Sequence, residues 1–390
     1  MSAFAFHTTP QIVVRPGAAG GIAETAGGRL GQSVLFVTDK GIRKAELDQT
    51  AIRSLEDAGH AVTVFDAVEA DPSLDTLMKS VEAARACGAT GVVALGGGSS
   101  LDVAKLTALL AGSGEDIDAA WGVGNAKGPR LPLVLIPTTA GTGSEVTPVA
   151  IITVGGEEKR GVSSPVILPD TAILDAELTV SLPAPATAAT GIDAMVHAIE
   201  AYASKNANNN PVSRMLATQA LSLLGANIET AVFSPENLEA RGAMLLGSTL
   251  AGMAFANSPV AAVHALAYPI GGTFHIPHGL SNALVLPQVL RFNAAEAENG
   301  SYRLYAELGP HAFADLEDIG GTQEGCTVFI ERIAALSAKI GLPQRLRDVG
   351  IGEEALPKMA SDAMKQTRLL VNNPRHIAEA DALAIYRAAW

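Results

Sequence analysis

The chain has 390 residues, of which 48% are hydrophobic and 17% charged, and its formal net charge at pH 7 is -13. This length exceeds that of a typical single domain, so we expect two domains with large apolar cores. The acidic balance argues against nucleic acid or an anionic membrane as a partner. Charges also interrupt the apolar runs too often for a membrane-spanning segment.

The N-terminal segment and the cysteines both point to the cytoplasm. The first seven residues lack the basic region and the long apolar stretch of a secretory signal. Cys87 and Cys326 lie far apart in the sequence and form no metal-spaced pair. This pattern is typical of a protein kept in a reducing compartment.

The first half of the chain alternates between predicted strands and helices. Extended runs at residues 4–7 and 11–15 are separated by Thr8-Thr9-Pro10, which predicts an edge hairpin. Buried strands are predicted at residues 34–38, 61–65, 91–95 and 133–136, and helices at residues 43–58 and 75–87. Such alternation, with nearly continuous apolar strands, predicts a parallel sheet covered on both faces. Ligands of these sheets bind at the carboxyl ends of the strands.

A glycine cluster follows the third predicted buried strand and opens the next helix. Gly97, Gly98 and Ser99 stand at this turn. Glycines let phosphate oxygens approach the backbone, and the free amides of a helix start favour an anion. The spacing matches neither the common dinucleotide fingerprint nor a P-loop. A plain glycine turn is the alternative, but the strand before and the helix after favour phosphate binding.

A second polar loop follows the strand at residues 133–136. It runs from Pro137 to Val146 and is dense in hydroxyls and glycines. These small donors suit a phosphate, a ribose or a nicotinamide amide, whereas a simple turn is the alternative. Its place at the same strand end as the glycine cluster favours cofactor binding.

The second half contains a helical stretch with a carboxylate and an imidazole four residues apart. Asp193 and His197 share one helix face, and Glu200 lies near the same side. Taken alone, the pair is better explained as an aspartate favoured by the helix dipole and an incidental histidine.

A second histidine-bearing segment changes that balance. His264, His275 and His278 fall within fifteen residues, although the whole chain has only 8 histidines. One carboxylate with three imidazoles is a ligand set that suits Fe²⁺, Zn²⁺ or a similar divalent ion.

Four motifs in this order resemble the iron-containing, or group III, alcohol dehydrogenases. The motifs are Gly96-Gly97-Gly98-Ser99-x-x-Asp102, Pro137-Thr138-Thr139-x-Gly141-Thr142-Gly143-Ser144-Glu145, Asp193-Ala194-x-x-His197-Ala198-x-Glu200, and His264-x-x-x-Tyr268-Pro269 with Pro277-His278-Gly279. The resemblance runs from the N-terminal segment through Leu290 and is weaker from there to Trp390. Four motifs in register are far more specific than any one of them.

The resemblance implies the fold and the site. The expected fold is dehydroquinate synthase-like: an α/β NAD-binding domain with a parallel sheet at residues 1–182, an all-helical metal-binding domain at residues 183–390, and an active site in the cleft between them. The composition agrees, because helical periods dominate from Pro183 onward. The implied metal ligands are Asp193, His197, His264 and His278, for Fe²⁺ or alternatively Zn²⁺. The implied cofactor residues are Gly97, Gly98, Ser99, Asp102, Thr138, Thr139, Thr142, Ser144 and Lys159. A homodimer is also expected, with the N-terminal hairpin pairing across subunits.

Asp39 bears on the choice of cofactor. It directly follows the predicted strand that ends at Thr38. A carboxylate there would accept hydrogen bonds from ribose hydroxyls and repel a 2′-phosphate, so we expect NAD(H) over NADP(H). A solvent-facing turn residue is the alternative.

The chain departs from the family pattern at one position. Many members carry a further histidine one helical turn after the third ligand, whereas this chain has Tyr268. A phenol has an unperturbed pKa of about 10, so it would need a metal or another cation nearby to pass protons near neutral pH. Our hypothesis is that Tyr268 or His275 takes part in the proton relay, with a packing role for Tyr268 as the alternative.

These features together predict a metal-dependent, NAD(H)-linked alcohol dehydrogenase or aldehyde reductase for a small alcohol, an aldehyde or a hydroxy acid. Phe255, Ile152 and residues 371–374 are candidates for a mostly apolar substrate pocket. A metal-free reductase of the maleylacetate reductase type is one alternative, although the ligand set is complete. A lyase on the related fold would need more Lys and Arg near the ligands, and a sensor without turnover would leave the ligand set unexplained.

Overall fold

The structure is a computed structural model that describes residues 3–155, 158–295, 300–316 and 320–390. The chain divides into two compact units. One is an α/β unit of residues His7–Thr139 and Gly143–Ser181. The other is a helical unit that comprises Met1–Phe6, Ala140–Thr142 and Leu182–Trp390.

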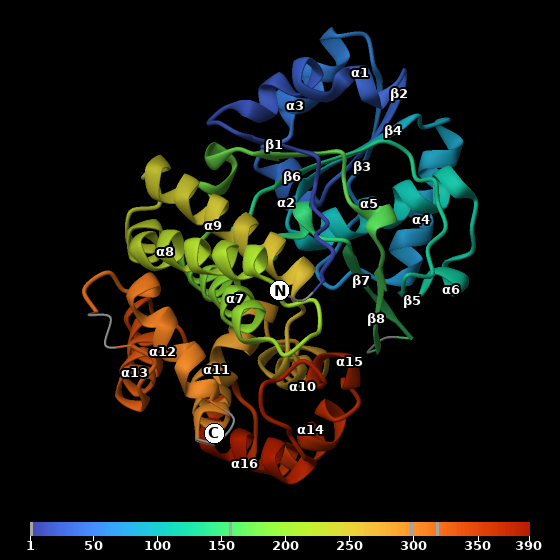
Figure 1. Ribbon diagram of the computed structural model, residues 1–390. Helices are drawn as coiled ribbons and strands as arrows, with labels where there is room; N and C mark the ends of the chain where they lie inside the picture. The colour runs from blue at the N-terminus through green and yellow to red at the C-terminus, as the bar shows by residue number, and fades with distance from the viewer. Residues whose placement is uncertain (1–2, 156–157, 296–299, 317–319) are drawn as a thin grey trace. The chain divides into compact units, whose positions relative to one another are not determined.

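The α/β unit, coloured from blue to green in Figure 1, is built on a six-stranded sheet. The strand order is β1-β9-β6-β4-β2-β3. Every neighbouring pair is parallel. The strands are β1 (Gln11–Val14), β2 (Ser33–Val37), β3 (Ala61–Phe65), β4 (Gly91–Gly96), β6 (Leu133–Pro137) and β9 (Thr171–Leu174). The predicted parallel sheet is therefore confirmed.

Both faces of this sheet are covered, which explains why its central strands β2, β4 and β6 are almost wholly apolar. Leu35 and Val37 of β2 pack into one core with α4 (Leu74–Ala86) and α5 (Gly98–Ser113). The alternate residues Val34 and Phe36 pack into a second core with α3 (Gln49–Asp57) and the preceding turns. Successive side chains of a strand point to opposite faces, so a strand buried on both faces has no polar positions.

Two local predictions for this unit are wrong. Residues 3–10 form no strand, and β1 pairs in parallel with β9, so there is no N-terminal hairpin. Ala5 instead exchanges two hydrogen bonds with Asn208 of the helical unit, to which both residues belong. The helix predicted at residues 43–58 is interrupted between α2 (Lys40–Lys44) and α3, because Glu46 takes a left-handed conformation with φ 58°.

A smaller three-stranded sheet completes the α/β unit. Its order is β5 (Gly122–Val123), β8 (Glu158–Ser163) and β7 (Val149–Val154). Strand β7 runs antiparallel to β8, and its alternate residues Ala150 and Ile152 are buried in the core shared with α4 and α5. Short helices complete the connections: α1 (Gly28–Leu30) and α6 (Ile117–Ala120).

The helical unit begins where Pro183 caps α7 (Ala184–Ala203). The remaining helices are α8 (Pro211–Phe233), α9 (Leu238–Asn257), α10 (Ala262–Phe274), α11 (His278–Ala294), α12 (Ser301–Ala312), α13 (Gln323–Lys339), α14 (Leu356–Ala363), α15 (Thr367–Leu370) and α16 (Glu379–Ala389). Helices α7, α8 and α9 pack against one another (Figure 1). Gly191 of α7 permits this packing, because a Cβ there would lie 2.8 Å from side chains of α8 and α9.

No single helix of the described segments is long and apolar enough to cross a bilayer alone. The pair α9 and α10 reaches the required length and apolarity only when joined across a bend of 108°.

Candidate metal centre and cofactor loops

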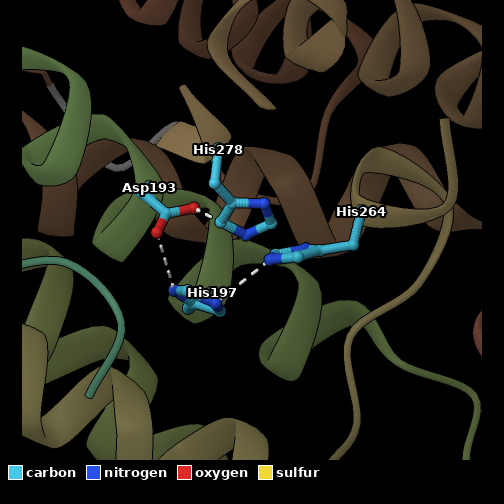
Figure 2. Close-up of side chains that lie close together, drawn as sticks. All are labelled: Asp193, His197, His264 and His278. Atoms are coloured by element: carbon cyan, nitrogen blue, oxygen red, sulfur yellow. Dashed lines mark hydrogen bonds and ion pairs between the residues drawn. The ribbon is translucent and has the colours of Figure 1, made fainter. Parts of the chain in front are cut away.

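Three helices of the helical unit bring the predicted metal ligands together. Asp193 and His197 lie one turn apart on α7, His264 lies on α10, and His278 is the first residue of α11. Figure 2 shows the four side chains converging, and their ligand atoms all lie within 4.8 Å of one another. The i, i+4 spacing on α7 places the first two ligands, whereas helix packing places the others.

The distances and burial within this Asp-His₃ cluster fit a small cation. The Nε2 atoms of His197 and His264 lie 3.0 Å apart, and Nε2 of His278 lies 3.7 Å from Oδ1 of Asp193. Asp193, His197 and His264 are buried, whereas the His278 side chain is 42% exposed. Of the four side chains, only that of His278 is exposed to solvent.

Gly279 allows α11 to approach α7 closely. A Cβ at this position would lie 2.4 Å from the carbonyl oxygen of Ala189 and 3.2 Å from Cβ of Asp193. Any other residue would push the two helices apart. The glycine that follows His278 therefore sets the distance between His278 and Asp193.

Glu200 orients His264, a role that the sequence did not assign. Its Oε2 lies 2.7 Å from Nδ1 of His264 and also accepts a hydrogen bond from the backbone N–H of Ala261 at 3.0 Å. Its Oε1 accepts from the N–H of Val263 at 2.6 Å. Since a carboxylate only accepts, Nδ1 of His264 carries the proton and Nε2 keeps a lone pair that faces the cluster. The spacing of three residues after His197 was the signal in the sequence.

Asn282 is a second residue that the sequence did not identify. It lies one turn after His278 on α11, and its Nδ2 donates a hydrogen bond to Oδ1 of Asp193 at 2.6 Å. The same nitrogen lies 3.3 Å from Nε2 of His264 and 3.3 Å from Nε2 of His278. Asn282 is fully buried. Its i, i+4 relation to His278 is the only sequence signal for it.

Phe255, predicted to line the substrate pocket, lies against a ligand. Its ring stacks on His197 with centroids 4.4 Å apart and planes inclined by 18°. The other pocket candidates lie elsewhere in the two units. Ile152 is fully buried in the core of the α/β unit, and Val371 is 63% exposed.

The electrostatics of the cluster favour a neutral His197 and an ionised Asp193. Burial lowers the pKa of His197 to about 3, against the opposing attraction of Asp193. Burial also tends to raise the pKa of Asp193, but the neighbouring histidines and the Asn282 hydrogen bond bring it below its ordinary value. A carboxylate and neutral imidazoles are the forms that bind a metal, so the residues present fit a divalent ion.

The two proton-relay candidates differ in their surroundings. Tyr268 lies on α10 one turn after His264, with its ring centroid 6.3 Å from that of His278. Its hydroxyl accepts a hydrogen bond from Arg368 at 3.4 Å. His275 is exposed at the end of α10, with a left-handed backbone of φ 55°.

In the α/β unit, the two predicted cofactor loops follow neighbouring strands. Gly97 caps α5 directly after β4, and Gly96 pairs with Pro137 at the end of β6. The N–H of Thr138 donates to the carbonyl of Gly96 at 3.0 Å. The next residue, Thr139, lies close to Gly97, because a Cβ atom on Gly97 would lie 3.8 Å from the Thr139 side chain. Thr142 clusters with the helical unit instead.

A cavity of about 450 Å³ opens at the glycine cluster. Its walls include Gly97, Ser99, Asp39 and Glu69. Oδ1 of Asp39 caps α2 by accepting from the N–H groups of Gly41 at 2.8 Å and Ile42 at 3.0 Å. Asp39 is therefore a cavity residue and a helix cap at once, rather than a solvent-facing turn residue alone.

The remaining cofactor candidates contact other protein groups. The hydroxyl of Ser144 donates to Oδ1 of Asp102 at 2.6 Å. Lys159 on β8 forms an ion pair with Asp71 at 2.5 Å and donates to the hydroxyl of Thr153 at 2.9 Å. These contacts hold both side chains in place within the α/β unit.

The fold and the site define the class of protein, which is a metal-binding oxidoreductase with a separate α/β unit. Comparison with known proteins gives the family. The family model "Iron-containing alcohol dehydrogenase" matches residues 9–176, and "Fe-containing alcohol dehydrogenase family, C-terminal" matches residues 187–390. The chain therefore belongs to the iron-containing alcohol dehydrogenase family and is an oxidoreductase. The predicted family, fold class and kind of activity are confirmed, and the match extends beyond Leu290 to residue 390.

Individual relatives agree over nearly the whole chain. Long-chain-alcohol dehydrogenase 1 of Geobacillus thermodenitrificans is 41% identical over 93% of this chain and 91% of the relative. A crystal structure of 1,3-propanediol oxidoreductase superposes with a TM-score of 0.93 at 35% identity, covering 100% of both chains. Sulfoacetaldehyde reductase of Bifidobacterium kashiwanohense, solved in complex with NAD⁺, gives a TM-score of 0.86 at 29% identity, covering 100% of this chain and 99% of that one.

Proposed function

We propose that this chain is a metal-dependent, NAD(H)-linked alcohol dehydrogenase that also works as an aldehyde reductase. The observation that carries the proposal is the Asp-His₃ cluster of Asp193, His197, His264 and His278, whose ligand atoms lie within 4.8 Å of one another. We assign Fe²⁺ to this cluster, with Zn²⁺ as the alternative that the same ligands accept. A complete ligand set, three members of which are buried, argues against a metal-free reductase.

Two observations support NAD(H) as the cofactor. Asp39 lines the cavity at the glycine cluster, where its carboxylate suits the ribose hydroxyls of NAD(H) and disfavours a 2′-phosphate. A structural relative with a TM-score of 0.86 was solved in complex with NAD⁺. We assign the phosphates to Gly97, Gly98 and Ser99 and the rest of the cofactor to Asp102, Thr138, Thr139, Thr142, Ser144 and Lys159.

The protein's own part in the reaction is to orient and to shield. When bound, the ion supplies Lewis-acid polarisation of the substrate C–O bond, and the nicotinamide gives or takes the hydride. Glu200 fixes the ring of His264, Asn282 fixes the carboxylate of Asp193, and Phe255 stacks on His197. The buried side of the cluster excludes water from the reacting groups. We assign the proton transfer to Tyr268 or His275.

One experiment tests the proposal directly. The purified enzyme is analysed for iron and zinc, and NADH oxidation is followed with a panel of aldehydes before and after chelation. We expect one divalent ion per chain, activity that chelation abolishes, and recovery on adding Fe²⁺ or Zn²⁺. Activity that persists in the metal-free enzyme would instead indicate a reductase of the maleylacetate reductase type, and no aldehyde turnover would reopen the lyase and sensor alternatives.

The substrate panel should span the chemistry of the relatives. Their names include a long-chain alcohol, 1,3-propanediol and sulfoacetaldehyde, which differ in length and charge. We propose small alcohols and aldehydes, because Phe255 lies against the ligand His197 and would limit the space beside the metal.

We also propose a cytoplasmic homodimer with a domain boundary at about Leu182. Both cysteines are free, which suits a reducing compartment. Strand β1 is the end strand of the six-stranded sheet, so it offers an edge for pairing with a second copy. Sedimentation at working concentrations should give a dimer, and a monomer would contradict this proposal.

A further inference from the structure

Lys105 is a completely buried lysine in the α/β unit that the proposed chemistry does not use. It lies on α5, and its side chain is 0% exposed. Its ammonium donates to the hydroxyl of Ser144 at 2.7 Å, the hydroxyl of Thr147 at 3.2 Å and the carbonyl of Val149 at 2.7 Å. All three protons of the ammonium therefore have an acceptor, which is the condition for burying a lysine.

Asp102 completes the charge balance from the preceding turn of the same helix. Its Oδ1 lies 3.5 Å from the Lys105 ammonium and accepts the hydroxyl proton of Ser144 at 2.6 Å. Its Oδ2 accepts from the backbone N–H of Ile151 at 2.9 Å. The hydroxyl of Ser144 thus accepts a hydrogen bond from Lys105 and donates one to Asp102. Both charged side chains therefore hold this one hydroxyl in place.

These bonds join the two polar loops at the carboxyl ends of β4 and β6. Helix α5, which carries Lys105, begins at the glycine cluster, and Ser144 lies near the end of the hydroxyl-rich loop that leaves β6. At the start of that loop, the N–H of Thr138 donates to the carbonyl of Gly96. Lys105 and Asp102 hold Ser144 near the other end, so the loop is bound to Gly96 at its start and to α5 near its end.

Such a cluster is a costly way to stabilise a fold. Burial lowers the pKa of Lys105 and raises that of Asp102, because each loses its hydration. Buried ion pairs often contribute less stability than apolar residues of the same volume. Because each of its hydrogen bonds is directional, the pair of Lys105 and Asp102 fixes the positions of the groups that it contacts. This defined geometry is what the pair supplies beyond stability.

We propose that Lys105 is a positioning residue for NAD(H), holding Ser144 and its loop against α5 in the arrangement that the cofactor requires. This inference rests on the proposed function, because it assigns the two loops to the cofactor. Lys105 acts through Ser144 and Thr147 and does not itself touch the cofactor.

The test compares Lys105→Met with Arg130→Met. Methionine keeps the length of the lysine stem but removes the ammonium. Arg130 is the matched control: its guanidinium is 14% exposed and bonds Asp170 and the carbonyl of Leu168 near the amino end of β6, away from the loops. Each variant is examined by NADH fluorescence titration, thermal unfolding, metal content and steady-state kinetics.

We expect Lys105→Met to bind NADH at least about tenfold more weakly, the effect of losing hydrogen bonds to a charged donor. The KM for NADH should rise in proportion, whereas kcat at saturating NADH and the metal content should stay close to those of the wild type. Arg130→Met should lose thermal stability but keep its NADH affinity. A Lys105→Met enzyme with reduced stability and unchanged NADH affinity would overturn the proposal.

Thr147→Val provides a second, milder variant if Lys105→Met does not fold. Valine matches the shape of threonine but removes one acceptor from the ammonium. We expect about threefold weaker NADH binding, in the range of a single hydrogen bond, and no further loss in combination with Lys105→Met. Unchanged affinity in Thr147→Val, or additive losses in the double variant, would contradict the inference. A wild-type enzyme that does not bind NADH would refute the proposed function instead.

Discussion

Glu200 and His264 form a buried carboxylate–imidazole pair, with Oε2 and Nδ1 2.7 Å apart, on the side of the imidazole away from the cluster. In Glu200→Gln, the new amide N–H₂ must face one of the N–H groups from which the carboxylate now accepts a hydrogen bond. We expect this conflict to disturb the tautomer of His264 and to weaken metal binding by about 10- to 100-fold, as is usual for such partners. Competition with a chromophoric chelator measures the affinity for Zn²⁺.

The control for this substitution is Glu307→Gln. Glu307 accepts an exposed hydrogen bond of 2.7 Å from the hydroxyl of Tyr202. Tyr202 lies on α7, the helix that also carries Glu200. Its loss should leave metal affinity unchanged. Equal Zn²⁺ affinities for Glu200→Gln and the wild type would show that the pair does not orient the ligand.

Asn282→Ala tests the second residue that contacts the ligands. Its amide donates to Asp193 at 2.6 Å, so its removal leaves a buried carboxylate oxygen without that donor. We expect metal affinity to fall by about tenfold or more. Asn293→Ala is the control. Asn293 is also a buried asparagine of α11, but its amide donates hydrogen bonds to Tyr305 and Asn373. Both variants should be less stable, but only the first should bind metal more weakly.

Asp39→Asn separates the two roles of Asp39. Asparagine caps a helix about as well as aspartate, so the hydrogen bonds to Gly41 and Ile42 should persist and the thermal stability should hold. The negative charge in the cavity is removed, so the preference for NADH over NADPH should shrink by about tenfold or more. Binding constants for both cofactors measure this ratio. An unchanged ratio would mean that Asp39 serves only as a cap.

Acid should destabilise the metal-free protein through His197. Burial lowers the pKa of His197 from 6.5 to about 3, so between these values the unfolded chain binds a proton that the folded chain does not. Stability is therefore fully present above the unfolded value and falls as the pH drops through this window. Urea unfolding of chelator-treated protein at about pH 7.5 and about pH 5 measures the loss. His197→Gln should reduce the difference, and an equal difference in this variant would rule out His197 as its source.

Tyr268→Phe and His275→Ala distinguish the two proton-relay candidates. The Tyr268 hydroxyl accepts from Arg368, so a cation stands beside the phenol, whereas His275 is exposed at a helix end. We expect Tyr268→Phe to lower kcat by about 100-fold, in the range of a lost general acid or base, and to alter the pH profile. His275→Ala should change neither. The opposite outcome would assign the relay to His275.

The sequence alone determined the features that depend on local pattern. Apolar runs predicted β2, β3, β4 and β6 to within one residue at each end. The signal is clearest for β4 and β6, because strands that are buried at every position leave no polar positions. The spacing of Asp193 and His197 predicted two ligands on one face of α7. Local pattern was misleading for the N-terminal hairpin, because residues 3–10 form no strand and β1 pairs with the distant strand β9.

Tertiary structure decided how distant residues meet. His264 and His278 reach Asp193 only because α10 and α11 pack on α7, with Gly279 permitting the close approach. Glu200 and Asn282 acquire their roles in the same way. Their spacing from His197 and His278 places them near the ligands on α7 and α11, but only packing brings them to hydrogen-bond partners 64 and 89 residues away. Lys105 is the clearest case, because a lysine on a helix is ordinarily solvated. Only the packing of α5 against residues 144–151 buries its charge and supplies the acceptors that make the burial tolerable.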